Sequence, residues 1–176
     1  MLNKKYQNLK NKQSKFLNSK FFPHIVFDNM IKNKLLNNVS KEINNSVSKA
    51  QPYYNYNVKK LAINRKKDFG KNTQKIIKYL NSRNFVKKLE NLTGIKKLVA
   101  DPRLEGGGIH IVKKGGFLNI HADFQSHIIN SQWSRKINLL LYLNKNWKKS
   151  FKGNLELWNQ KRTKKISILP KFNRAV

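Results

Sequence analysis

A histidine and an aspartate stand two positions apart in the second half of the chain, at His121 and Asp123, within the glycine-rich stretch of residues 104–124. This stretch predicts a strand, and residues i and i+2 of a strand project from the same face. An imidazole and a carboxylate held side by side make up two of the three ligands of a 2-His-1-carboxylate site for non-haem Fe(II). His121 and Asp123 are therefore the candidate metal ligands, and the sequence shows no evident third ligand.

The spacing alone also fits a simpler explanation, because histidine and aspartate recur two residues apart by chance and many histidines are half-buried polar side chains. His127 lies four residues beyond Asp123, where a strand has already left the metal, so the sequence predicts a loop histidine near the mouth of a cleft. His110 is predicted to be a structural or hydrogen-bonding residue beside the ligands. His24 is predicted to stand where a strand begins.

Short strands are predicted on both sides of the His-x-Asp pair. Residues 109–112 form an apolar run between two groups of glycines. Residues 135–143 predict a buried strand, and residues 153–158 predict another after a polar turn. The second half of the chain is therefore expected to be mainly β-structure.

Helices are predicted in the first half of the chain. Apolar side chains recur at helical spacing over residues 29–49 and again over residues 72–92, where the helix is expected to end near Gly94. Between them, residues 52–56 predict an aromatic, irregular connector. Helices packed outside a run of antiparallel strands are typical of a jelly-roll relative.

The order of these motifs resembles the prolyl-4-hydroxylase-like branch of the Fe(II)/2-oxoglutarate-dependent dioxygenases. In that family a glycine-rich segment leads into a His-x-Asp strand, a Tyr-Leu-Asn-x-x-Trp turn and a Gly-Gly-x-Leu strand, and the same order runs here from Gly106 to Trp158. Residues 22–30 resemble the family's opening strand and helix, and residues 169–174 resemble the strand that leads towards its distal histidine. The resemblance covers most of residues 21–176.

The resemblance implies an α+β fold, a double-stranded β-helix of the jelly-roll or cupin type with N-terminal helices packed outside. It also implies that His121 and Asp123 bind Fe(II), that Tyr142 hydrogen-bonds 2-oxoglutarate, and that Leu140 and Leu155 supply apolar walls. O2 would be the other cosubstrate and ascorbate a supporting reductant, while the substrate is open between a peptidyl residue and a small molecule. Without the resemblance, Tyr142 fits equally well as a core aromatic with a satisfied hydroxyl.

The sequence departs from the family pattern in several places. The family's distal histidine and its basic residue for 2-oxoglutarate follow the strand at residues 169–174, so the domain is expected to lack its C-terminal strands and to have impaired activity. Leu118 replaces an aromatic residue, and Lys152 replaces the first glycine of the Gly-Gly pair. Residues 1–20 are predicted to be a basic lead-in, and residues 21–176 the incomplete dioxygenase-like domain.

Composition limits the remaining possibilities. The 176 residues suffice for one domain with a core, and cysteine is absent, which excludes disulfides and cysteine-based zinc sites. No apolar run is long enough to span a membrane, and no signal peptide is evident, so a cytoplasmic location without a membrane partner is expected.

The basic character of the chain opens two alternatives to an enzyme. Lys and Arg total 38 against 8 Asp and Glu, which gives a net charge of +30 and predicts non-specific, salt-sensitive binding of polyanions. Because heavy Lys use accompanies heavy Asn and Ile use, base composition explains part of this charge. A non-catalytic jelly-roll binding module and a basic nucleic-acid-binding protein therefore remain beside the dioxygenase.

Overall fold

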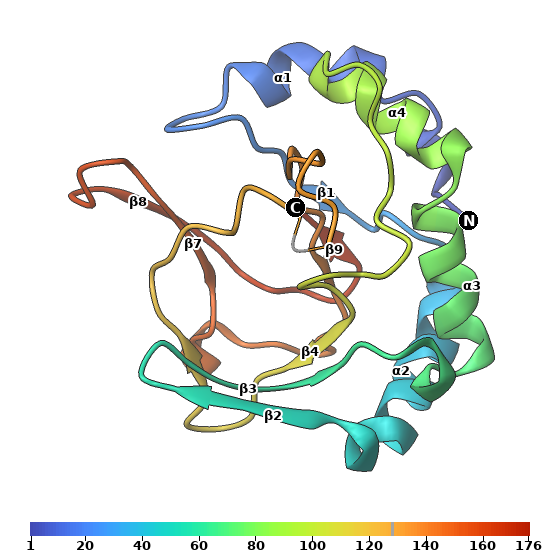
Figure 1. Cartoon of the computed structure of the whole chain (residues 1–176), viewed down its shortest axis with the longest axis vertical. Helices are drawn as coiled ribbons and strands as arrows, with labels where there is room; N and C mark the ends of the chain where they lie inside the picture. Colours follow the sequence, from blue (N-terminus) through green and yellow to red (C-terminus); the bar gives the residue numbers. More distant parts are fainter. Residues whose placement is uncertain (128) are drawn as a thin grey trace.

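A computed structural model describes residues 1–127 and 129–176 and combines helices with short antiparallel strands (Figure 1). The helices are α1 (Gln13–Leu17), α2 (Asn33–Ser46), α3 (Lys71–Leu80) and α4 (Arg83–Thr93). Turns of 3-10 helix are η1 (Lys4–Tyr6), η2 (Lys10–Lys12), η3 (Val47–Lys49), η4 (Lys66–Asp68) and η5 (Lys149–Phe151). The strands are β1 (Phe27–Asp28), β2 (Gln51–Asn55), β3 (Val58–Ile63), β4 (Ile109–Ile111), β5 (Phe117–Leu118), β6 (Leu141–Tyr142), β7 (Leu155–Trp158), β8 (Lys165–Ile168) and β9 (Arg174–Ala175).

The strands form separate antiparallel sheets. In one sheet β9 lies between β1 and β6, and in another β3 lies between β2 and β4. β5 pairs with the beginning of β3 and β4 with its end, so β4 and β5 continue one another along the same edge. β7 pairs with β8. The α+β class is confirmed, whereas the described strands do not close into the barrel that a double-stranded β-helix requires.

The hydrophobic core lies between the helices and the sheet of β1, β9 and β6. The helices α2, α3 and α4 follow one another along one side of the molecule (Figure 1). Their apolar faces meet side chains from β1, β9 and the N-terminal segment. The buried core residues are Leu2, Tyr6, Leu9, Ile25, Phe27, Met30, Ile31, Leu36, Val39, Ile76, Phe85, Leu92 and Ala175. None of the helices in the described part of the chain is long and apolar enough to cross a membrane.

Residues 1–20, the predicted basic lead-in, contribute to this core. Leu2, Tyr6 and Leu9 are buried, and Leu2 forms an isolated β-bridge with Ile31. The Tyr6 hydroxyl donates a hydrogen bond to the carbonyl of Asp28 at 2.7 Å. Three well-spaced apolar residues therefore suffice to fix a strongly basic segment.

The predicted helix over residues 72–92 is divided into α3 and α4. Ser82 separates them, because its hydroxyl accepts a hydrogen bond from the Phe85 amide and donates one to the Tyr79 carbonyl. Apolar side chains keep helical spacing on both sides of the break, so periodicity alone does not reveal it. The expected end at Gly94 is confirmed, since this residue has φ +78° and caps α4.

The aromatic segment at residues 52–56 was predicted to be irregular, but most of it forms β2. Asn55 makes the turn to β3 by accepting hydrogen bonds from the Asn57 and Val58 amides at 2.8 and 3.1 Å. Every residue of β2 is exposed. Since neither face of this strand is buried, its sequence has no apolar alternation, and this explains the wrong prediction.

Candidate metal centre

His121 and Asp123 lie side by side, with His121 Nε2 3.5 Å from Asp123 Oδ1. The strand expected to carry them is shorter than predicted, because β5 ends at Leu118 and residues 119–124 have no regular secondary structure. Their side chains are 44% and 39% exposed, so both atoms are accessible to a ligand. The backbone thus brings the pair together without a continuous strand.

The hydrogen bond that His121 makes through Nδ1 leaves Nε2 available to bind a metal. His121 Nδ1 lies 2.8 Å from the carbonyl oxygen of Asn119, and this contact requires a proton on Nδ1. In the neutral imidazole, Nε2 then carries a lone pair, and it is Nε2 that faces Asp123. Two atoms that ligate one ion at adjacent octahedral positions are about 3 Å apart, close to the observed separation.

The second carboxylate oxygen of Asp123 is held by two side chains that the sequence did not single out. Arg135 Nη1 lies 3.0 Å from Asp123 Oδ2, and the Asn138 amide donates to the same oxygen at 2.9 Å. Arg135 is itself fixed, because Nη2 donates to the Glu105 carbonyl at 3.2 Å and the guanidinium covers the Phe124 ring at 3.9 Å. Oδ1 therefore remains directed towards His121.

Arg135 and Asn138 are expected to act as positioning residues. In Arg135→Met and Asn138→Leu variants, loss of one donor should let the carboxylate rotate and weaken divalent-metal binding by about 10- to 100-fold. Calorimetry with Mn(II), a redox-stable substitute for Fe(II), measures the change. Arg103→Met is the matched control, since the Arg103 side chain is exposed and its amide hydrogen bond is unaffected. Equal affinities in all variants would contradict the positioning role.

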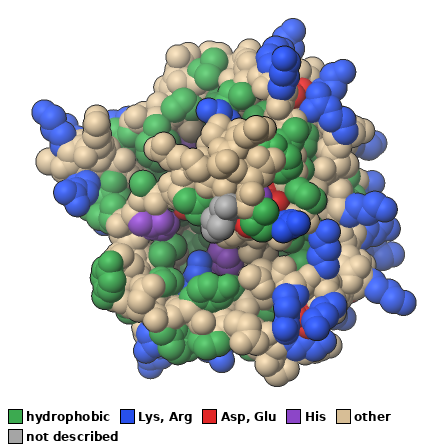
Figure 2. Space-filling view, viewed as in Figure 1, with side chains coloured by type: hydrophobic (Ala, Val, Ile, Leu, Met, Phe, Trp, Pro, Cys, Tyr) green, Lys and Arg blue, Asp and Glu red, His purple; other side chains and the backbone are tan. Residues whose placement is uncertain are grey.

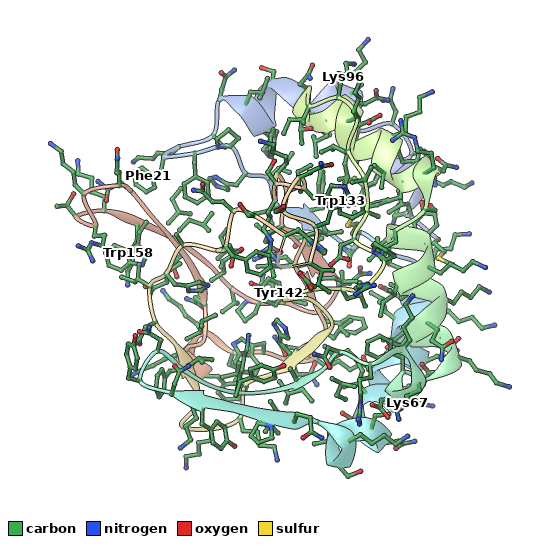
Figure 3. The ribbon with its side chains drawn as sticks, viewed as in Figure 1. Phe21, Lys67, Lys96, Trp133, Tyr142 and Trp158 are labelled. Carbon is green, nitrogen blue, oxygen red and sulfur yellow. The ribbon has the colours of Figure 1, made fainter. Side chains whose placement is uncertain are left out.

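Tyr142 lies on β6, near the centre of the molecule as drawn in Figure 3. Leu139, Leu141 and Leu143 of the same extended segment pack against the hydrophobic core. Alternate residues of extended chain point in opposite directions, so Leu140 and Tyr142 project to the face from which Asn138 reaches Asp123. Burial raises the pKa of Tyr142 to about 12, which keeps its hydroxyl protonated and able to donate a hydrogen bond.

Leu155, the other predicted wall residue, is half-buried at the start of β7, where it pairs with Ile168. Its position as a wall of the metal centre stays a prediction.

His127 contacts two other carboxylates. Its ring is only 12% exposed, and Nε2 is 3.5 Å from both Asp101 Oδ1 and Glu105 Oε2. Nδ1 accepts from the amides of residues 129 and 130. This histidine therefore lies in a loop, as predicted, with its ring beside two carboxylates, and its place at the mouth of a cleft stays a prediction.

The third ligand of a facial triad is not supplied by the described residues. Both His127 nitrogens face protein groups, and no group of three His, Cys, Asp or Glu side chains suited to a metal ion occurs within residues 1–127 and 129–176. The candidate donor set is thus the His121–Asp123 pair. Its nitrogen and carboxylate oxygen are the ligand types that non-haem iron uses.

Comparison with known proteins gives one family match. Residues 107–176 match the family model described as the 2OG-Fe(II) oxygenase superfamily. The matched range covers less than half of the chain and contains His121, Asp123, Leu140, Tyr142 and Leu155. The match supports placing the chain in this oxygenase superfamily. Membership implies Fe(II) as the metal and 2-oxoglutarate and O2 as cosubstrates. No curated protein and no solved structure matches the chain.

Proposed function

We propose that this protein is a 2-oxoglutarate- and Fe(II)-dependent oxygenase in which His121 and Asp123 hold the metal. The proposal rests chiefly on one observation: an imidazole nitrogen of His121 and a carboxylate oxygen of Asp123 face one another at 3.5 Å. The remaining polar atoms of both side chains are engaged with protein groups, so the pair is held ready for a cation. The family match over the same residues supports the choice of metal.

The other predicted site residues bind and shield the cosubstrate in this proposal. The Tyr142 hydroxyl donates a hydrogen bond to the far carboxylate of 2-oxoglutarate, which its raised pKa allows at neutral pH. Leu140 and Leu155 exclude water from the reacting groups. Bound Fe(II) supplies the oxidative chemistry that converts 2-oxoglutarate and O2 to succinate and CO2 and hydroxylates a C–H bond of the substrate. We further propose that the substrate is a prolyl residue, as in the prolyl-4-hydroxylase-like branch.

Binding and turnover test the proposal together. Wild-type protein with Mn(II) is expected to bind 2-oxoglutarate more tightly than the metal-free protein, because the cosubstrate contacts both the metal and Tyr142. Tyr142→Phe should weaken 2-oxoglutarate binding about tenfold while leaving Mn(II) affinity unchanged. Succinate release with Fe(II) and ascorbate is the activity readout, and His121→Ala should abolish it. Metal-independent 2-oxoglutarate binding, or turnover that survives His121→Ala, would reject the assignment.

Non-specific binding of polyanions is a second property that we propose, and the charge balance favours it. The chain carries 38 basic and 8 acidic residues, and Lys and Arg side chains are spread over the face shown in Figure 2. Such a surface attracts nucleic acids mainly through counterion release, so the affinity should fall steeply with salt and show no sequence preference. This property requires none of the residues of the metal centre.

A further inference from the structure

Two side chains that can donate hydrogen bonds to an anion, Lys60 and His110, share one face of the sheet formed by β2, β3, β4 and β5. In the β3–β4 ladder Ala62 stands opposite His110, and directly opposed residues project to the same side. Lys60 lies two residues before Ala62 on β3 and therefore projects to that side as well. Across the β2–β3 ladder Tyr53 stands opposite Lys60, and its ring centroid lies 6.0 Å from Lys60 Nζ.

Both side chains lie within electrostatic range of Asp123. Burial lowers the pKa of Lys60, and the Asp123 carboxylate acts in the opposite direction. Burial also lowers the pKa of His110, and the Lys60 charge lowers it further. The Gly107 backbone and Asp123 act in the opposite direction and raise this pKa. Lys60, His110 and Asp123 are thus close enough to act on one another electrostatically.

The surroundings of His110 are partly enclosed by protein. His110 is exposed to solvent, yet it is surrounded by enough protein to lose hydration. Figure 2 shows a recess near the middle of one face of the molecule, with histidine and basic side chains in it and at its rim.

The Lys60 ammonium has no ion-pair partner among residues 1–127 and 129–176. Asp123, the carboxylate that acts on it, is already bound by Arg135 and Asn138. In the part of the chain that the structure describes, no carboxylate or carbonyl forms an ion pair or hydrogen bond with the Lys60 ammonium, whose recorded contact is the Tyr53 ring. A half-buried ammonium without an acceptor is unfavourable, and a bound anion would offset its desolvation.

We infer that Lys60 and His110 form a binding site for an anionic group, a carboxylate or a phosphate, of the primary substrate. The inference rests on the proposed oxygenase function, because it places this group beside the His121–Asp123 pair. The far carboxylate of 2-oxoglutarate is assigned to Tyr142 on β6, which belongs to a different sheet from β3 and β4. Lys60 would donate hydrogen bonds from its ammonium and His110 from a ring nitrogen, which makes both specificity-determining residues.

Anion titration of the whole, metal-free chain tests the site. The His110 ring resonances are followed by NMR while inorganic phosphate and, separately, succinate are added, so that the two anion types are compared directly. One of them should give a saturable shift, and Lys60→Met should weaken it about tenfold or more. Lys59→Met is the matched control, because Lys59 is the exposed neighbour on the opposite face of β3. Lys60→Arg should retain binding.

The outcomes separate this inference from the proposed function. Equal effects of Lys60→Met and Lys59→Met, or shifts that never saturate, would show a general response to surface charge and overturn the anion site. If Lys60→Met weakens 2-oxoglutarate binding while Tyr142→Phe does not, the site belongs to the cosubstrate and the inference is wrong. Saturable anion binding in a protein that fails to bind Mn(II) would reject the metal centre alone, because the titration needs no metal.

Discussion

Asp123→Ala is expected to abolish specific metal binding, with Mn(II) affinity reduced about 100-fold or more. The substitution removes one of the two available ligands. It also frees the Arg135 guanidinium, now 3.0 Å from the carboxylate, to place an uncompensated positive charge next to His121 Nε2. The loss of a ligand and the added repulsion both lower the affinity for the metal. Calorimetry or paramagnetic relaxation with Mn(II), followed by anaerobic Fe(II) titration, measures the effect.

Glu156→Ala is the control for this experiment. Glu156 is also an exposed carboxylate paired with a cation, since its Oε1 lies 2.6 Å from Lys165 Nζ, but it lies on β7 and has no histidine beside it. Its loss changes the net charge by the same amount as the loss of Asp123. If the two variants bind Mn(II) equally well, the metal is attracted by surface carboxylates in general and the His121–Asp123 centre does not exist.

The helices show how far apolar spacing alone predicts this fold. Periodicity located α2, α3 and α4 because each buries one face against the core. It failed where hydrogen bonds rather than apolar contacts decide the backbone, as at Ser82, whose hydroxyl ends one helix and begins the next. It also failed for β2, whose exposed tyrosines carry no burial pattern.

The candidate metal centre was predictable only in part for a related reason. A spacing of two residues identified His121 and Asp123, because local backbone geometry is sufficient to bring them together. Arg135 and Asn138 reach Asp123 from 12 and 15 residues away in sequence, and Lys60 acts on it from β3, so no local pattern connects them. The alternation of leucines over residues 139–143 was a usable signal for Asn138, since it places this residue on the Tyr142 face.

Asn173→Ala is expected to cause the largest loss of stability, about 4 kcal/mol of unfolding free energy. The Asn173 side chain is fully buried, accepts a hydrogen bond from the Ile31 amide at 2.9 Å, and donates to the Ile31 carbonyl and to Asn33 Oδ1 at 2.6 Å each. Alanine would leave the Ile31 amide and carbonyl without these hydrogen bonds in the interior, whereas Asn33 is exposed and can bond to water instead. The substitution would also keep the strained φ of +60°, which asparagine tolerates better than alanine. Urea unfolding followed by circular dichroism gives the value.

Asn146→Ala separates the backbone part of this effect from the hydrogen bonds. Asn146 has a similar φ of +53° but is exposed, so its replacement should cost only about 1 kcal/mol. A loss of the same size in both variants would mean that the buried hydrogen bonds of Asn173 contribute nothing. The backbone amide of Asn173 also donates to the Tyr142 carbonyl at 2.9 Å, and the backbone carbonyl of Asn173 accepts from the Met30 amide at 3.1 Å. Loosening Asn173 should therefore disturb β6 and weaken 2-oxoglutarate binding at Tyr142 under conditions in which Asn146→Ala leaves it intact.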